Sequence, residues 1–170
     1  MSETPRIRTL EAADWRDYKQ IRLSALQDSP DAFGSTYERS ARIPDSDWQA
    51  RVGSLDARFD LPLVACLGNR FVGLAWGRIE PEAPQHAHLY QMWVDPAVRG
   101  RGIGQQLVEQ VIGWARQAGC KTMVLQVTEG DRPARRLYER LGFIATGALV
   151  PLREGSALME QTMELSLIPG

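Results

Sequence analysis

Apolar residues recur along the chain at two different spacings, one typical of helices and the other of strands. From residue 103 to residue 115 they fall three or four positions apart, at Ile103, Leu107, Val108, Val111, Ile112 and Ala115. The segment from about Ala13 to Gln27 repeats this spacing at Tyr18, Ile21 and Ala25. Side chains at this spacing share one helix face, so both segments are predicted to be amphipathic helices. A further helix is expected to begin after the turn at residues 44–46.

Runs of apolar and β-branched residues predict the strands. Ile7–Leu10 forms a short first strand, and Leu61–Leu67 and Phe71–Ile79 form a hairpin across residues 68–70. Residues 88–94 carry apolar side chains at both odd and even positions, which predicts a central strand that is covered on both faces. Lys121–Thr128, which lies between glycines, is predicted to be the next strand.

The C-terminal segment alternates apolar and polar residues. Its apolar positions are Met159, Met163, Leu165 and Leu167, and the polar ones between them are Glu160, Thr162, Glu164 and Ser166. Such alternation predicts a half-buried, edge-type strand, and its simplest partner is Phe143–Leu152 across residues 153–157. Together the segments predict one α/β domain of the α+β type over residues 1–170. It would have a mixed twisted sheet of about six to seven strands, flanked by about four helices.

The predicted strand at 88–94 leads through Pro96 into a glycine-rich turn, directly before the helix at 103–115. The glycines occupy alternate positions, Gly100, Gly102 and Gly104. Because they lack side chains, backbone N–H groups are left uncovered at a helix N-terminus, where the helix dipole also favours an anion. The arrangement predicts a phosphate-binding loop, although a tight strand–helix turn with glycines for close packing would show the same pattern.

Two common phosphate-binding motifs do not fit this loop. A P-loop requires a lysine directly after its second glycine, and no lysine follows Gly104. A dinucleotide fingerprint requires a glycine three residues after Gly102, where this chain has Gln105. The spacing that fits is Arg-x-x-Gly-x-Gly, formed by Arg99, Gly102 and Gly104. It closely resembles the acyl-CoA-binding motif of the GCN5-related N-acetyltransferase (GNAT) superfamily.

A second segment, residues 131–143, resembles the same superfamily. It follows the pattern Asn-x-x-Ala-x-x-Leu-Tyr-x-x-x-Gly-Phe at Ala134, Leu137, Tyr138, Gly142 and Phe143. At the first position Asp131 replaces the asparagine that is usual in the family, and its carboxylate can cap a helix. Pro133 suits the first turn of that helix, and Gly142 suits the left-handed position after its end.

The resemblance implies a GNAT-like fold in which the strands at 88–94 and 121–128 run parallel and splay apart. The pantetheine arm of acetyl-CoA would then pair with the backbone of the central strand, and the CoA pyrophosphate would bind the loop amides. The cofactor-binding residues implied in this way are Met92, Trp93, Val94, Arg99, Gly100, Arg101, Gly102, Ile103, Gly104, Gln105 and Asp131. The resemblance also implies that Tyr138 is the general acid that protonates the CoA thiolate. The helical pattern alone would make Tyr138 a core aromatic residue.

The implied activity is transfer of an acetyl group from acetyl-CoA to a primary amine by direct attack. An alkylammonium group with a pKa of about 10 is protonated at neutral pH, so a base or a water relay must take its proton. No carboxylate lies between Glu82 and Asp95, and the base is left unassigned among Glu80, Glu82, His88, Tyr90 and water. The acceptor could be a polyamine, an amino acid, an antibiotic or a protein amine. A non-catalytic acyl-CoA-binding sensor or regulatory module is the alternative function.

Composition and charge narrow the expected partners. The chain has 170 residues, of which 44% are hydrophobic, enough for one domain with a substantial core. Its net charge of −1 provides no overall attraction to nucleic acid or to anionic membranes. Arginines gather near both motifs, and a solvated helix face is the simplest interpretation of Arg136 and Arg140. A small-molecule or peptide amine is therefore the expected partner, and a homodimer is left open.

The remaining sequence features concern location and metals. No apolar run is long enough to span a membrane, and Met1–Pro5 does not begin like a signal peptide, so a cytoplasmic protein is expected. Cys66 and Cys120 are expected to be buried thiols, because two cysteines make no disulfide framework. With two histidines in the chain, no metal cofactor is expected.

Overall fold

The computed structural model describes residues 4–169, in which seven strands form one mixed sheet. The strands lie in the order β1-β2-β3-β4-β5-β7-β6. Their bounds are β1 Arg6–Thr9, β2 Asp60–Leu67, β3 Arg70–Ile79, β4 His86–Val94, β5 Thr122–Thr128, β6 Ile144–Pro151 and β7 Met159–Ser166. The predicted hairpin and the predicted central strand are both present. The expectation about a signal peptide concerns residues that lie mostly outside the described part.

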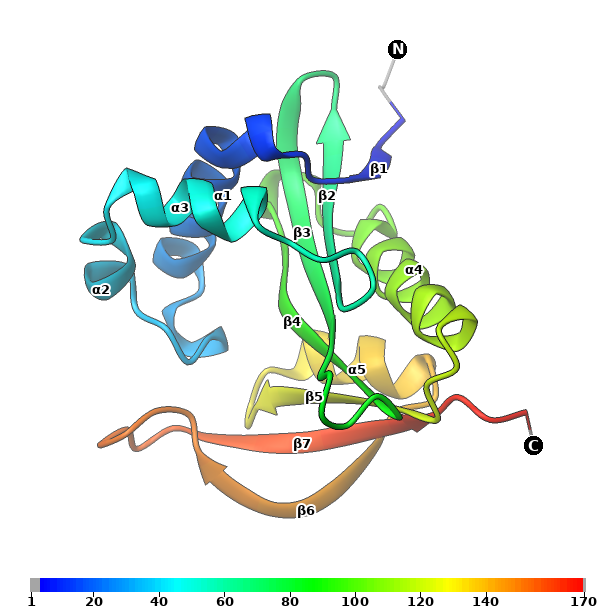
Figure 1. Cartoon of the computed structure of the whole chain (residues 1–170). Coiled ribbons are helices and arrows are strands. Elements are labelled where there is room, and N and C mark those ends of the chain that lie inside the picture. The colour runs from blue at the N-terminus through cyan, green and yellow to red at the C-terminus, as the bar shows by residue number, and fades with distance from the viewer. Residues whose placement is uncertain (1–3, 170) are drawn as a thin grey trace.

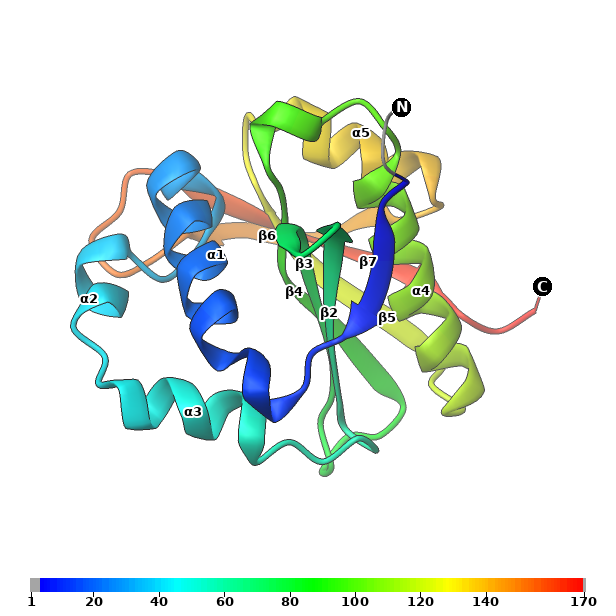
Figure 2. The ribbon, with the colours of Figure 1, turned by 90° about the horizontal axis from the view of Figure 1, so that it is seen from above.

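Helices cover both faces of this sheet (Figures 1 and 2). The described α-helices are α1 Trp15–Asp28, α2 Tyr37–Ala41, α3 Asp45–Gly53, α4 Ile103–Gln117 and α5 Arg132–Arg140. Short 3-10 helices lie at Ala12–Asp14, Pro30–Ala32 and Pro96–Val98. Helices α1 to α3 lie on one side of β2–β4, and α4 lies on the other. The sequence predicted about four helices, and the additional one is the single-turn helix α2.

The two central strands splay apart, as the resemblance implied. Strand β4 pairs with β5 in parallel only from His86 to His88. Strand β5 pairs with β7 along its whole length, and beyond Val124 it turns away from β4 (Figure 1). The predicted GNAT-like mixed sheet with a central splay is therefore confirmed.

Two predictions about sheet edges and coverage were wrong. Strand β7 is not an edge strand, because it pairs with β5 on one side and with β6 on the other. At this end of the sheet the edge strand is β6. Alternation of apolar and polar residues could not distinguish an edge strand from an inner one, because it reports that one face is buried and not how many strands lie alongside. Strand β4 is central but only partly covered on its α1 side, where Trp93 is buried beside α1 while Tyr90 is 40% exposed.

Two clusters of buried side chains form the core, one on each side of the sheet. The larger cluster contains the predicted face of α4, at Ile103, Leu107, Val108, Val111, Ile112 and Ala115. The smaller one joins α1 and α3 to β2–β4 and contains Tyr18, Ile21 and Ala25. Cys66 and Cys120 are buried free thiols, as expected. Between residues 4 and 169, every helix is too short or too polar to cross a bilayer.

Candidate functional site

The glycine-rich turn connects the end of β4 to the N-terminus of α4. Asp95 begins the turn by accepting a 2.9 Å hydrogen bond from the Ala97 amide. Gly100 and Gly102 then adopt left-handed conformations, with φ of 83° and 81°. Gly102 is the N-cap of α4, and a Cβ atom at either glycine would meet nothing within 4 Å. These glycines are therefore required by backbone conformation and face open space, and close packing does not explain them.

The backbone N–H groups of residues 100–105 form the chemical surface of this turn. Among the described residues, none of these groups donates a hydrogen bond, whereas the Gln106 amide begins the helical pattern by bonding to the Gly102 carbonyl at 3.1 Å. Unpaired amides at the positive end of a fifteen-residue helix favour an anion. The loop therefore offers a group of unpaired amides that can bind an anion.

A pocket of about 410 Å³ opens in front of this loop. Ten of the eleven residues predicted to bind the cofactor line it, namely Met92, Trp93, Val94, Arg99, Gly100, Gly102, Ile103, Gly104, Gln105 and Asp131. The exception is Arg101, which is exposed and outside the lining. Arg140, which the sequence assigned to a solvated helix face, is exposed but also borders this pocket. The pocket thus joins both sequence motifs in one cavity.

Asp28, at the end of α1, connects this pocket to the helical layer on the other side. Its Oδ2 accepts hydrogen bonds from Arg99 Nη2 at 2.8 Å and from Trp93 Nε1 at 3.0 Å. Arg99 also donates through Nε to the Val94 carbonyl at 2.9 Å. Partial burial alone would raise the Asp28 pKa, but the hydrogen bonds from Ser29, Trp93 and Arg99 together lower it. The side chain of Arg99 is therefore held by the protein itself, a role that the sequence did not indicate.

The second motif forms α5 as predicted. Asp131 caps this helix by accepting a hydrogen bond from the Ala134 amide at 3.3 Å, and Gly142 ends it with φ of 101°. Tyr138 is 6% exposed, and its ring packs edge-on against Phe143. Its side chain makes no hydrogen bond to the described residues. Burial, with a smaller contribution from the Asp131 carboxylate, raises the pKa of Tyr138 far above its ordinary value. The phenol therefore remains protonated at working pH.

Tyr138 lines a second pocket, of about 370 Å³, which shares lining residues with the first. Ala32 and Met92 line both pockets and mark the junction. The second pocket occupies the splay between β4 and β5, since Leu89 and Leu125 of these strands form part of its wall. The two pockets are therefore neighbours on either side of Met92 and Ala32.

A β-bulge in β4 lies at this junction. Trp93 pairs with Leu74 and Tyr90 pairs with Trp76, so Gln91 and Met92 both oppose the single residue Ala75. Gln91 has φ of 56°, a left-handed conformation that is uncommon for a residue with a side chain. The Tyr18 hydroxyl donates a 2.7 Å hydrogen bond to Gln91 Oε1 and holds the bulge in place. A bulge of this kind interrupts the ladder and frees backbone groups for a ligand.

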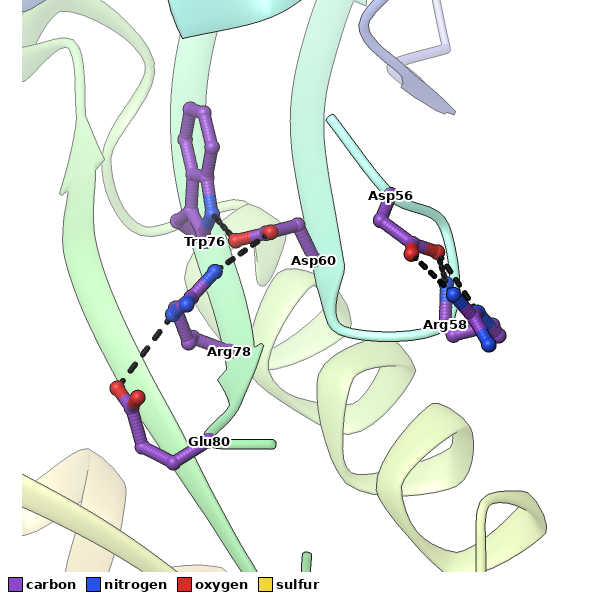
Figure 3. Close-up of polar contacts among 6 residues, drawn as sticks. All are labelled: Asp56, Arg58, Asp60, Trp76, Arg78 and Glu80. Carbon is purple, nitrogen blue, oxygen red and sulfur yellow. Dashed lines mark hydrogen bonds and ion pairs between the residues drawn. The ribbon is translucent and has the colours of Figure 1, made fainter. Parts of the chain in front are cut away.

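Of the four residues considered as bases, the structure brings only Tyr90 to the second pocket. Glu80 lies 3.4 Å from Arg78, whose Nη1 contacts Asp60 at 2.7 Å, and Asp60 also accepts from Trp76 at 2.9 Å (Figure 3). Glu82 is exposed and outside both pockets. His88 stacks on Tyr90, with ring centroids 5.7 Å apart, and burial lowers its pKa. Neither Glu80 nor His88 lines the first or the second pocket.

The lining of the second pocket includes residues that the sequence did not predict for a site, among them Arg22, Gln91 and Glu160. The burial of Arg22 could have been predicted from the sequence, because this residue follows Tyr18 by one helical turn and so belongs to the buried face of α1. Glu160 is the only acidic residue in the lining of this pocket. Glu160 forms no ion pair with any residue between 4 and 169. Burial raises the pKa of its carboxyl group. Within the same residues, no group of three His, Cys, Asp or Glu side chains is placed to hold a metal ion.

Comparison with known proteins gives one family and one fold. Residues 15–143 match the sequence profile of the acetyltransferase (GNAT) family. The mycothiol acetyltransferase of Thermomonospora curvata is 30% identical over 138 residues, which are 81% of this chain and 43% of that protein. The chain thus spans less than half the length of this curated relative.

Solved structures resemble the whole chain. The protein yncA from Salmonella typhimurium, solved with its cofactor acetyl-CoA, has a TM-score of 0.80 at 22% identity, covering 98% of this chain and 96% of that one. An acetyltransferase of the GNAT family from Streptococcus pneumoniae has a TM-score of 0.81 at 18% identity, covering 96% and 99%. At these identities the likeness concerns the fold.

Proposed function

Because this chain belongs to the acetyltransferase (GNAT) family, we propose that it transfers the acetyl group of acetyl-CoA to the nitrogen of a primary amine. The observation that carries this proposal is that Met92 and Ala32 line both the pocket of the glycine-rich loop and the second pocket. A catalyst that joins two substrates requires two sites in contact at the reacting atoms. A protein that only bound acyl-CoA would not require the second pocket.

The loop residues are suited to hold acetyl-CoA. The free amides of residues 100–105 would bind the pyrophosphate, and the apolar side chains of Met92 and Val94 would line the pantetheine channel. When bound, acetyl-CoA supplies a thioester carbonyl that an amine can attack. In this proposal, a backbone N–H at the bulge of Gln91 and Met92 would donate a hydrogen bond to the thioester oxygen and stabilise the developing charge.

Tyr138 is proposed as the general acid. The neutral amine forms a bond to the carbonyl carbon, the carbon–sulfur bond breaks, and the leaving thiolate takes the phenolic proton of Tyr138, while the nitrogen releases its second proton to water to become an amide. Tyr138 then regains a proton from solvent. Its place in the wall of the second pocket, with a phenol that burial keeps protonated, supports this role. The proton released by the ammonium group passes to water or to a carboxylate in the pocket before attack, because only the neutral amine is nucleophilic.

Release of free CoA thiol from acetyl-CoA, measured with a panel of amines, tests the proposal. The panel includes polyamines, amino acids, aminoglycoside-type amines and peptides with a free N-terminus. Thiol release that requires both acetyl-CoA and one class of amine supports the enzyme. If acetyl-CoA binds and no amine in any class releases thiol, the alternative of a non-catalytic acyl-CoA sensor replaces the proposal.

A further inference from the structure

A buried arginine without an anionic partner lies in the wall of the second pocket. Arg22, on the inner face of α1, is 7% exposed and lines this pocket. Its Nη1 atom is fully buried and has no hydrogen-bond partner among the described residues. Its guanidinium carbon lies 4.6 Å from the centroid of the Phe33 ring, which covers one side of the cation. A buried charge without a partner destabilises the folded protein, so such groups are rare unless a ligand supplies the missing hydrogen bonds and opposite charge.

The surroundings of Arg22 do not supply the missing negative charge. The charged and titratable groups near it are the Tyr18 phenol and a second cation, Arg51. The Tyr18 hydroxyl donates a hydrogen bond to Gln91, and the phenol remains neutral because burial raises its pKa. Burial and the repulsion from Arg51 both lower the pKa of Arg22, but an arginine stays protonated in proteins. The pocket is therefore positively charged on the α1 side.

The opposite charge lies elsewhere in the same pocket. Glu160 on β7 lines the pocket, and no ion pair within 4.0 Å joins it to Arg22. The rest of the lining is mixed, with apolar Leu89, Leu125 and Leu152 beside polar groups such as Gln91 and Gln126. A pocket with one cation and one separate carboxylate in its lining is complementary to a small molecule that carries both charges.

We infer that the amine acceptor is a small amino-acid-like molecule whose carboxylate binds Arg22 while its ammonium group is received by Glu160. This inference rests on the proposed acetyltransferase function and narrows its acceptor. Arginine is suited to this role because its planar fork can donate two hydrogen bonds to one carboxylate. Glu160 attracts the ammonium form and, because burial has raised its pKa, can accept the proton that the amine must lose before attack.

A comparison of free amino acids with their carboxamides tests the inference. Each carboxamide keeps the amine and the side chain but replaces the carboxylate with a neutral group of the same shape. We expect at least one free amino acid to be acetylated with a kcat/KM about tenfold or more above that of its carboxamide, because the site would leave its buried cation unpaired with the neutral analogue. The less basic amine of the carboxamide is more often neutral, and this difference opposes the expected preference.

Two variants assign the preference to its residues. Arg22→Met keeps much of the length and apolar stem of the side chain, and it should reduce the preference for the free acid to about onefold. Arg22→Lys keeps the positive charge and should retain part of the preference for the free acid. Glu160→Gln should raise the KM of the acid and of the carboxamide together, since both carry the ammonium group. Arg16→Met is the matched control, because Arg16 lies on the exposed side of α1 and should keep the full preference.

The outcomes separate this inference from the function on which it rests. Equal acetylation of acids and carboxamides, a preference that survives Arg22→Met, or acetylation confined to amines without a carboxylate would overturn the inference and leave the acetyltransferase standing. If no amine of any kind is acetylated, the proposed function fails and the inference fails with it.

Discussion

Asp28 and Arg99 form a 2.8 Å ion pair between the end of α1 and the start of the glycine-rich loop. The two residues are separated by 71 positions in the sequence. Since Arg99 also bonds to the Val94 carbonyl, the pair holds the end of β4, the loop and the helical layer together. The phosphate loop is therefore anchored from the side of the molecule that forms the second pocket.

This pair predicts a stability difference that depends on pH. Because the hydrogen bonds from Ser29, Trp93 and Arg99 lower the pKa of Asp28, the ionised carboxylate stabilises the fold above the ordinary aspartate pKa of about 3.9. This contribution is lost as the pH falls through the lowered pKa. Asp28→Asn should therefore reduce the free energy of unfolding at pH 7 by about 0.2–1 kcal/mol, the range for partly exposed pairs.

Urea unfolding of both proteins between neutral and strongly acidic pH measures this difference. It should narrow toward zero on the acidic side of the ordinary aspartate pKa. A difference that stays constant across the whole range would show that the charge of Asp28 does not contribute.

The loop predicts that a side chain at Gly102 blocks CoA. Gly102→Val adds a branched side chain where the backbone would approach the phosphate, and it strains a left-handed residue. CoA affinity measured by calorimetry should fall at least tenfold, which corresponds to about 1.4 kcal/mol. Gly119→Val is a matched control, because Gly119 has a similar φ of 84° and equally open surroundings but lies outside the pocket. Equal CoA affinity in both folded variants would remove the loop from the binding site.

The cap at Asp131 predicts a conservative substitution. Asparagine caps helices as well as aspartate, so Asp131→Asn should keep the melting temperature. It also removes a negative charge from the pocket of an anionic ligand, so CoA affinity should be equal or better. Asp131→Ala, which removes the cap altogether, should cost about 1 kcal/mol of stability. A sharp loss of CoA affinity in Asp131→Asn would show that the carboxylate itself contributes to binding.

The position of Tyr138 predicts a kinetic effect without a structural one. Tyr138→Phe keeps the ring against Phe143 and removes only the hydroxyl. Turnover should fall on the order of 10²-fold, the low end for lost general acid catalysis, while CoA affinity and melting temperature change little. If the variant loses stability and keeps normal turnover, Tyr138 is a core aromatic residue without a catalytic role.

Local patterns in the sequence predicted the parts of the molecule that depend on local chemistry. Alternate glycines before an amphipathic helix define the loop at Gly102, because φ and helix polarity are properties of a short segment. The same holds for the cap at Asp131 and for the buried face of α4. Helix α2 was missed because a helix of five residues is too short to show a periodic pattern.

Features that depend on distant segments could not be predicted in this way. The position of β7 inside the sheet depends on which strands meet after folding. The alternation of apolar and polar residues around Met163 would be the same in an edge strand and in an inner strand. Arg22 and Glu160 come from α1 and β7 and share a pocket only because β4 and β5 splay apart. The anchoring of Arg99 by Asp28 likewise requires the packed helical layer.

Transfer of an isotope-labelled acetyl group is the most direct test of the acetyltransferase account. The protein is incubated with acetyl-CoA that carries the label in its acetyl group and with the best amine of the panel, and the products are analysed by mass spectrometry. The account predicts that the label appears on the amine nitrogen in an amount equal to the free CoA released, with no label on the protein after turnover. Release of CoA without labelled amine, or a label that stays on the protein, would contradict direct transfer between the two pockets.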